Sequence, residues 1–180
     1  MSVGRTAVNR ESHSPERPSV TPNAHAWESP RGWALSLALI STVAVAARVA
    51  YVLRVLGPVR SGLDAIWYQL QGGSILAGTG YVVPTSLFEG ELTPTAAFPP
   101  VYPAYQALWQ WMFGPGATAV RMAGVVPGVV TVVLVAILGR ALADARVGLL
   151  AAGAVALSPT LVAADSSTMS ENLTVPLVLA

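Results

Sequence analysis

The chain has 180 residues, of which 53% are hydrophobic and only 11% are charged, and its mean hydropathy is +0.58. Soluble domains carry about 25% charged residues, so this composition cannot easily cover a surface exposed to water and a lipid bilayer is the expected solvent. The formal net charge of +1 argues against a nucleic-acid partner. The absence of cysteine excludes disulfides and thiolate metal sites.

Residues 1–32 differ from everything after them, since they are rich in proline, serine and arginine and show no apolar periodicity. Such a segment buries too little apolar area to offset the entropy of ordering it. We therefore predict a disordered tail, and its four arginines place it on the cytoplasmic side by the positive-inside rule.

The first strongly apolar segment covers residues 33–56 and is long enough, at about 1.5 Å per residue, to cross about 30 Å of hydrocarbon. The tail before it is too long for the basic region of a signal peptide, so an uncleaved anchor is expected. Trp33 and Tyr51 stand near its ends, where aromatic rings favour the membrane interface.

Residues 57–116 are mixed in character and are predicted to form an outer loop with juxtamembrane helices over 64–76 and 102–113. Further apolar segments follow, and they predict membrane helices over 117–139, 147–164 and 172–180 onward. The predicted fold is therefore an all-α integral membrane domain over 33–180, with about three complete transmembrane helices and the start of a fourth. Because the last apolar segment stops partway, we expect the chain to be an N-terminal fragment of a larger helical bundle.

The side on which each loop lies depends on whether residues 102–113 cross the membrane. A dozen helical residues reach only about 18 Å, and Gln106 and Gln110 share one face, so a helix lying on the membrane surface is favoured. The loop with Arg140 and Arg146 is then cytoplasmic. Asp64 and Glu171 fall on the same extracytoplasmic face; a spanning 102–113 would separate them, and Arg60 and Arg121 count mildly for that alternative.

An ordered set of features follows the arginine-bearing first helix. These are Asp64 and Tyr68, the segments 77–81 (AGTGY) and 99–103 (PPVYP), Gly114 with Arg121, Ser158-Pro159 and Ser170-Glu171. In order and spacing the set resembles the start of the multi-helix glycosyltransferases that use polyprenyl-phosphate sugar donors. The nearest group is the dolichyl-phosphate-mannose–protein mannosyltransferase-like family, with a GT-C fold.

The resemblance implies a first outer loop with a catalytic acid, matched by position to Asp64, and a second acid matched to Glu171. Many members carry two adjacent acids in the first loop, whereas Ala65 follows Asp64 here. It also implies an enzyme of the bacterial plasma membrane, which moves a sugar from a polyprenyl-phosphate donor to a hydroxyl of a protein, lipid or glycan outside the cytoplasm. The alternative is a non-enzymatic multi-pass protein, such as a transporter or a lipid-binding scaffold.

The two candidate catalytic carboxylates each have a structural alternative. Asp64 is suited to take the proton of the attacking hydroxyl, and it is equally suited to cap a helix over 65–76. Glu171 is a second carboxylate for the acceptor or a cation, or else an acid that interacts with a helix dipole. Asp165 competes with it in the same loop. Carboxylates from the two loops could bind Mg²⁺ or Mn²⁺, although nothing in the sequence demands a metal.

Four further residues are candidates for binding the lipid-phosphate sugar. Arg48 lies inside the first apolar segment, where an arginine costs about 2.5–3.5 kcal/mol on insertion scales. It is expected either to snorkel towards water or to contact the donor phosphate, and Arg121 has the same two interpretations. Tyr68 belongs to the family pattern, and Tyr102 is either a ligand contact or an interface anchor.

Two short motifs have ordinary explanations. Gly124 and Gly128 form a G-x-x-x-G pattern that favours close approach of helices over dimerisation. The triplet 172–174 (NLT) fits a glycosylation sequon, but it begins a membrane segment and is common by chance.

Overall fold

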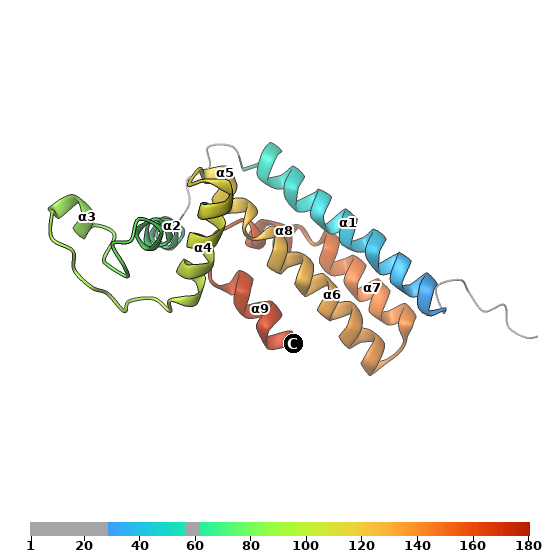
Figure 1. Ribbon diagram of the computed structural model, residues 1–180. Coiled ribbons are helices and arrows are strands. Elements are labelled where there is room, and N and C mark those ends of the chain that lie inside the picture. The colour runs from blue at the N-terminus through green and yellow to red at the C-terminus, as the bar shows by residue number, and fades with distance from the viewer. Residues whose placement is uncertain (1–28, 57–61) are drawn as a thin grey trace, which may run out of the picture.

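Helices account for the regular structure in the computed structural model, which describes residues 29–56 and 62–180 (Figure 1). Within these ranges there is no β-strand, only an isolated antiparallel bridge between Val82 and Pro94. The helices are α1 (Pro30–Arg54), α2 (Leu63–Leu76), α3 (Ser86–Glu89), α4 (Val101–Phe113), α5 (Ala117–Met122), α6 (Val125–Leu142), α7 (Ala145–Leu157), α8 (Pro159–Asp165) and α9 (Glu171–Leu179).

Helix α1 starts at Pro30, inside the segment that the sequence predicts to be a disordered tail. The Ser29 side chain accepts a hydrogen bond from Gly32 N at 3.0 Å, and Pro30 takes the first helical position, where its missing N–H is not needed. The rest of the predicted tail, residues 1–28, lies outside the described residues.

Among the residues that the structure describes, two helical stretches are long and apolar enough to cross a membrane, namely α1 and residues Ala117–Leu142, which include α5 and α6. Helices α7 and α8 together qualify as a third if they form one span, and they meet at an angle of 62°. These lengths and compositions indicate a membrane-embedded helical protein. The 13-residue α4 is too short to belong to this set.

The membrane helices α1, α6 and α7 lie side by side as a bundle (Figure 1). Small side chains form its core, so the helices approach closely: Ala44, Val132, Ala136, Ala152 and Ala156. At one end of the α6–α7 pair, a Cβ on Gly148 would overlap the Ala136 carbonyl oxygen. This pattern of small residues at helix contacts is typical of association within lipid.

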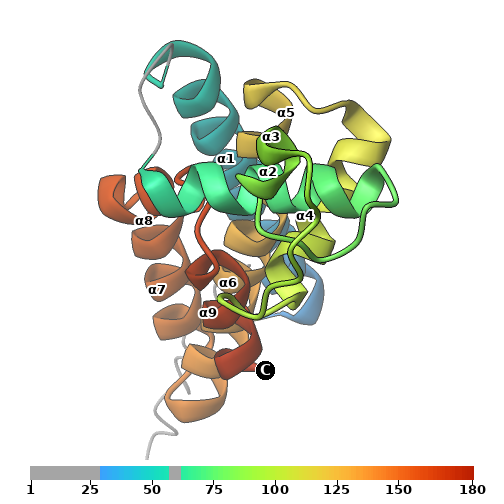
Figure 2. The same ribbon diagram turned by 90° about the vertical axis from the view of Figure 1, so that its left-hand side faces the viewer.

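Helices α2, α3 and α4 form a separate layer at the end of the bundle where α1 finishes (Figure 1). Figure 2 shows α2 lengthwise, crossing the direction of the bundle helices. Helix α2 packs on α4 through Gly72, whose missing side chain leaves room for Gln106 and Gln110. This layer covers most of the outer loop predicted over residues 57–116.

The apolar segments 117–139 and 147–164, predicted as single helices, are both interrupted. The first breaks between α5 and α6 around Ala123 and Gly124. The second bends at Ser158, because Pro159 has no N–H and disfavours helical backbone in the residue before it. The last segment forms α9, which begins at Glu171 and runs beside α6.

Candidate charged and aromatic site

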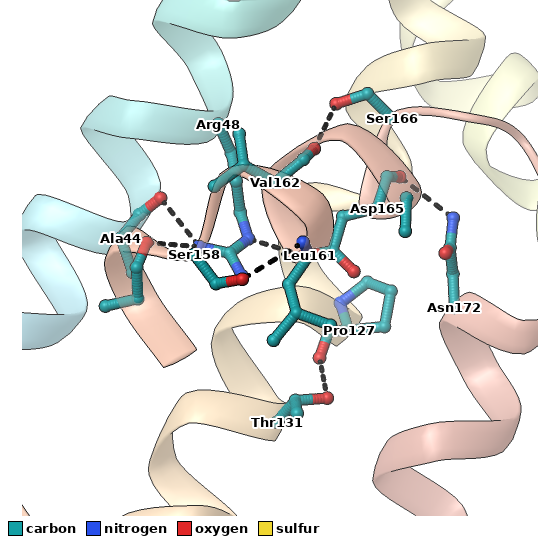
Figure 3. Close-up of polar contacts among 12 residues, drawn as sticks. Ala44, Arg48, Pro127, Thr131, Ser158, Leu161, Val162, Asp165, Ser166 and Asn172 are labelled. Atoms are coloured by element: carbon teal, nitrogen blue, oxygen red, sulfur yellow. Dashed lines mark hydrogen bonds and ion pairs between the residues drawn. The ribbon is translucent and has the colours of Figure 1, made fainter. Parts of the chain in front are cut away.

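Arg48 on α1 is buried inside the bundle, with only 1% of its surface exposed, and it has an ionic partner there (Figure 3). Its Nε donates to Asp165 Oδ2 at 2.7 Å, and its Nη1 donates to the carbonyl oxygens of Ala44 and Ala156, both at 3.3 Å. The expected snorkelling of Arg48 is therefore wrong, because an internal ion pair satisfies the guanidinium within the bundle. Contact between Arg48 and a donor phosphate stays a prediction.

Gly128 of α6 and Gly124, the N-cap residue of α6, make room for this ion pair. A Cβ on Gly128 would overlap both Asp165 Oδ2 and Arg48 Nε, and a Cβ on Gly124 would overlap the main-chain carbonyl of Asp165. The G-x-x-x-G pattern thus allows close approach, as predicted, and what approaches is the last turn of α8 with its carboxylate. The ion pair and the end of α8 fit against α6 because Gly124 and Gly128 have no side chains to block them.

The bend between α7 and α8 supplies part of the polar surroundings of Arg48. Helix α7 ends at Leu157, so the Ala156 carbonyl has no following helical turn to accept from and is available to Arg48 Nη1. The new helix α8 begins at Pro159 with Ser158 as its N-cap and brings Asp165 to the guanidinium. One local break therefore provides both a carbonyl and a carboxylate to a charge in the membrane.

The segment between α8 and α9 is held in place by its own side chains. Asn172, at 5% exposure, donates from Nδ2 to the Asp165 carbonyl at 2.8 Å. Ser166 and Thr168 are also buried, and Thr168 has a φ of 60°, a left-handed conformation that is unusual for a β-branched residue. Burial of the Asn172 amide also leaves the 172–174 triplet unsuited to glycosylation.

Two tyrosines from the outer layer border this segment. Tyr68 of α2 donates to Ser170 Oγ at 3.3 Å, and Ser170 in turn donates to Glu171 Oε2 at 3.5 Å.

Tyr102 of α4 accepts from Gln106 Nε2 at 2.9 Å and shares a side-chain hydrogen bond with Asn172. The two tyrosine rings meet edge to face with centroids 5.0 Å apart. Burial raises the pKa of the Tyr102 hydroxyl far above its ordinary value, so it stays protonated as a donor.

A small cavity of about 60 Å³ lies beside the Arg48–Asp165 ion pair. Its polar lining comes from Arg48, Thr131, Asp165, Glu171 and Asn172. This is room for a water molecule or a small ion and not for a sugar. Glu171, which lines this cavity, is exposed at the surface of the molecule. Within the described residues, no three His, Cys, Asp or Glu side chains are close enough to bind a metal ion.

Asp64 and Arg121 lie apart from this group. Asp64 is exposed in the first turn of α2, one turn before Tyr68, and no hydrogen bond or ion pair joins it to the other candidate residues in the described part of the chain. The helix-cap alternative for Asp64 is wrong, since Gly62 is the N-cap of α2 and no side chain caps it. Arg121 is half-buried in the last turn of α5 and does not line the small cavity.

Thus four of the six predicted site residues, Arg48, Tyr68, Tyr102 and Glu171, meet around the segment 165–172. Sequence reasoning missed the part of Asn172, and it treated Asp165 only as a competitor of Glu171. The signal for Asp165 was present, because a membrane arginine needs an acid nearby and Asp165 ends an apolar segment. Asn172 gave no such signal.

The chain was also compared with known proteins, by sequence and by structure. Comparisons with protein-family models, with curated proteins and with solved structures found no match.

Proposed function

We propose that the chain belongs to a membrane glycosyltransferase that moves a sugar from a polyprenyl-phosphate donor to a hydroxyl acceptor on the extracytoplasmic face. The observation that carries the proposal is the hydrogen-bonded row Tyr68–Ser170–Glu171. It joins the loop before α9 to α2, the helix that bears Asp64 in its first turn. The row therefore links the helix that bears Asp64 to the start of α9, where Glu171 lies, which supports a role for both acids in one site.

The chemistry assigned to the two carboxylates follows from their positions. Asp64 is exposed at the N-terminus of α2, where the helix dipole favours a negative charge. It takes the proton of the acceptor hydroxyl as the oxygen attacks the anomeric carbon. The bond from that carbon to the phosphate oxygen breaks, and polyprenyl phosphate leaves with the electron pair. Glu171 orients the acceptor through hydrogen bonds.

The remaining candidates bind the sugar donor in this proposal. The Tyr102 hydroxyl, which stays protonated, is a hydrogen-bond donor for a sugar or phosphate oxygen, and Tyr68 orients Ser170 through the hydrogen bond that its hydroxyl donates to Ser170 Oγ. Arg121 supplies positive charge for the phosphate, and Arg48 contacts the phosphate by sharing its guanidinium between the phosphate and Asp165. Inversion at the anomeric carbon is the stereochemistry that the resemblance implies.

A transfer assay on the full-length gene product in its membrane tests the enzyme. Radiolabelled polyprenyl-phosphate sugars are supplied, and label in an acceptor fraction is counted. We expect Asp64→Ala to lower transfer by about 100-fold or more, as loss of a general base does, and Glu171→Gln to lower it less. Glu91→Gln is the matched control, since Glu91 is an exposed acid of the outer layer. Transfer that Asp64→Ala leaves undiminished would contradict the role given to Asp64.

A second candidate function rests on the buried ion pair. A transporter or a lipid-binding scaffold needs polar groups inside its helix bundle, and the Arg48–Asp165 pair is such a group. Topology separates the two functions. The chain has no cysteine, so single cysteines at positions 64 and 171 can be labelled from either side of the membrane without background. If both cysteines are labelled from the same side, the result supports a shared active site. If they are labelled from opposite sides, a shared active site is excluded.

A further inference from the structure

An open apolar groove runs along the outside of the bundle between α1 and α7, at the end away from the candidate site. Its volume is about 770 Å³, within the range of small-molecule sites. The lining comes from Ile40 of α1 and from one face of α7, which runs from Arg146 through Leu150 and Gly153 to Leu157. One cation stands at the mouth, and the rest of the lining is apolar.

The length of the groove along α7 is close to the hydrocarbon thickness of one bilayer leaflet. Arg146 and Leu157 are 11 positions apart on α7, which is about 16 Å at about 1.5 Å per residue. Half of a hydrocarbon core of about 30 Å is about 15 Å. An acyl chain that lies in the groove from Arg146 inwards would therefore end near Leu157, one residue before the bend at Ser158.

The charge at the mouth of the groove selects an anion. Arg146 is exposed at the second position of α7, where the helix dipole favours a negative charge over a positive one. Its side chain makes no ion pair within the described residues. Arg31 and Arg140 are exposed at the same end, and Arg140 stacks over the Trp33 ring at 4.5 Å. Asp144, two positions before Arg146, carries a negative charge, and its carboxylate caps α7 by accepting from Val147 N.

Gly153 gives a second, independent indication of an occupant. A glycine inside a helix costs about 1 kcal/mol relative to alanine. The other two glycines near the α6–α7 contact, Gly139 and Gly148, pack against the facing helix. A Cβ on Gly153, in contrast, would meet no other protein atom within 4 Å. The space that Gly153 leaves belongs to the groove.

We propose that this groove binds one anionic phospholipid, in the leaflet on the side of the N-terminal tail. The phosphate-bearing headgroup contacts Arg146, and one acyl chain lies along Leu150, Gly153 and Leu157 against Ile40. The site is separate from the candidate glycosyl-transfer site and does not depend on that function.

Lipid titration of the purified full-length protein tests the site. The protein is delipidated in mild detergent and titrated with phosphatidylglycerol or phosphatidylcholine of the same acyl chains, and native mass spectrometry counts the retained lipids. We expect phosphatidylglycerol to bind about fivefold more tightly, the effect of one arginine on an anionic lipid. Arg146→Gln should remove this preference, and Gly153→Phe should weaken the binding of both lipids.

The controls keep the result interpretable. Arg31→Gln removes an exposed arginine from the same end but outside the groove, and it should change the lipid preference less than twofold. Circular dichroism and a thermal transition establish that each variant folds, and Gly153→Ala replaces Gly153→Phe if the larger residue fails. The proposal is overturned if Arg31→Gln and Arg146→Gln change the lipid preference equally. It is also overturned if the protein retains neither lipid, because another segment or a second copy then covers the groove.

Discussion

The membrane bundle and the outer layer differ in the side chains that hold their helices together. In the bundle, alanine and glycine bring α1, α6 and α7 together, and the polar Arg48 group is satisfied on several sides. In the α2–α4 layer, aromatic rings run in sequence from Trp67 and Phe98 to Trp109 and Phe113, and buried glutamines lie between the helices. Polar side chains are thus rare in the core of the bundle and common between the helices of the outer layer.

The solvent of each region explains the difference. Lipid offers no hydrogen bonds, so a polar group in the bundle has to find its partners within the protein. The outer layer, in contrast, contains the fully buried Gln71, whose side-chain amide has no hydrogen-bond partner among the described residues. Four predictions follow for the two regions.

The largest effect is expected when the bundle ion pair loses one partner. Arg48→Met leaves Asp165 as an uncompensated buried charge, which typically costs about 3–5 kcal/mol of stability. The double variant Arg48→Met with Asp165→Leu should recover most of the loss, since it removes both charges. Unfolding in mixed micelles measures both variants. If the double variant is no better than the single one, the pair does not hold the bundle together.

A smaller loss is expected when a side chain is added at the α6 groove that seats Asp165. Gly128→Ala forces its new methyl group against the Asp165 carboxylate and Arg48, and such overpacking costs about 1–3 kcal/mol. Gly153→Ala is the matched control, because nothing opposes its methyl group and alanine is the better helix former. Thermal transitions of the two variants should shift in opposite directions. Equal shifts would mean that the close approach at Gly128 is unimportant.

In the outer layer a single hydroxyl should matter less. Tyr68→Phe removes the bond to Ser170 and should cost about 0.5–1.5 kcal/mol, while the ring contacts with Phe98 and Tyr102 remain. Tyr51→Phe on α1 is the control. If the row Tyr68–Ser170–Glu171 matters for function, transfer activity falls in Tyr68→Phe by more than its stability loss explains, whereas Tyr51→Phe leaves activity unchanged.

The smallest effect is confined to alkaline pH. Burial raises the pKa of Tyr105 on α4 to about 12 from its ordinary value of 10.0, and its hydroxyl donates to the Ala123 carbonyl. The contribution of the protonated form is complete below pH 10.0 and is lost as the pH rises to about 12. Stability should therefore fall less steeply across this window in Tyr105→Phe. An ultraviolet titration that finds no late-ionising tyrosine would contradict the assignment.

The sequence predicts the helices better than it predicts their partners. Hydropathy and periodicity are local signals, so the expected helices over 64–76 and 102–113 correspond closely to α2 and α4. The ion pair between Arg48 and Asp165 joins residues 117 positions apart, and only the cost of a membrane arginine hints at it. Pro159 in the sequence indicates a bend at Ser158. That the bend makes the Ala156 carbonyl available to Arg48 depends on the position of α1, which the sequence does not show.

The candidate site was predicted in part for the same reason. Tyr68, Tyr102 and Glu171 were chosen from an ordered pattern, and they meet around Asn172, which the sequence presented only as a sequon. Asp64 was expected on the same membrane face as Glu171, and in the structure it is linked to that residue only indirectly, through α2 and Tyr68. A shared membrane face is a coarser property than a contact.

The separation of Arg48 from Asp165 has a consequence for biosynthesis. The two residues are 117 positions apart, and at about 5–20 residues per second the ribosome needs about 6–23 seconds to make that stretch. Helix α1 therefore enters the membrane long before its counter-ion exists. During that interval Arg48 has to be sheltered by the insertion machinery or by a water defect. Arrival of α8 ends this exposure, so the final position of α1 is set by a helix translated much later.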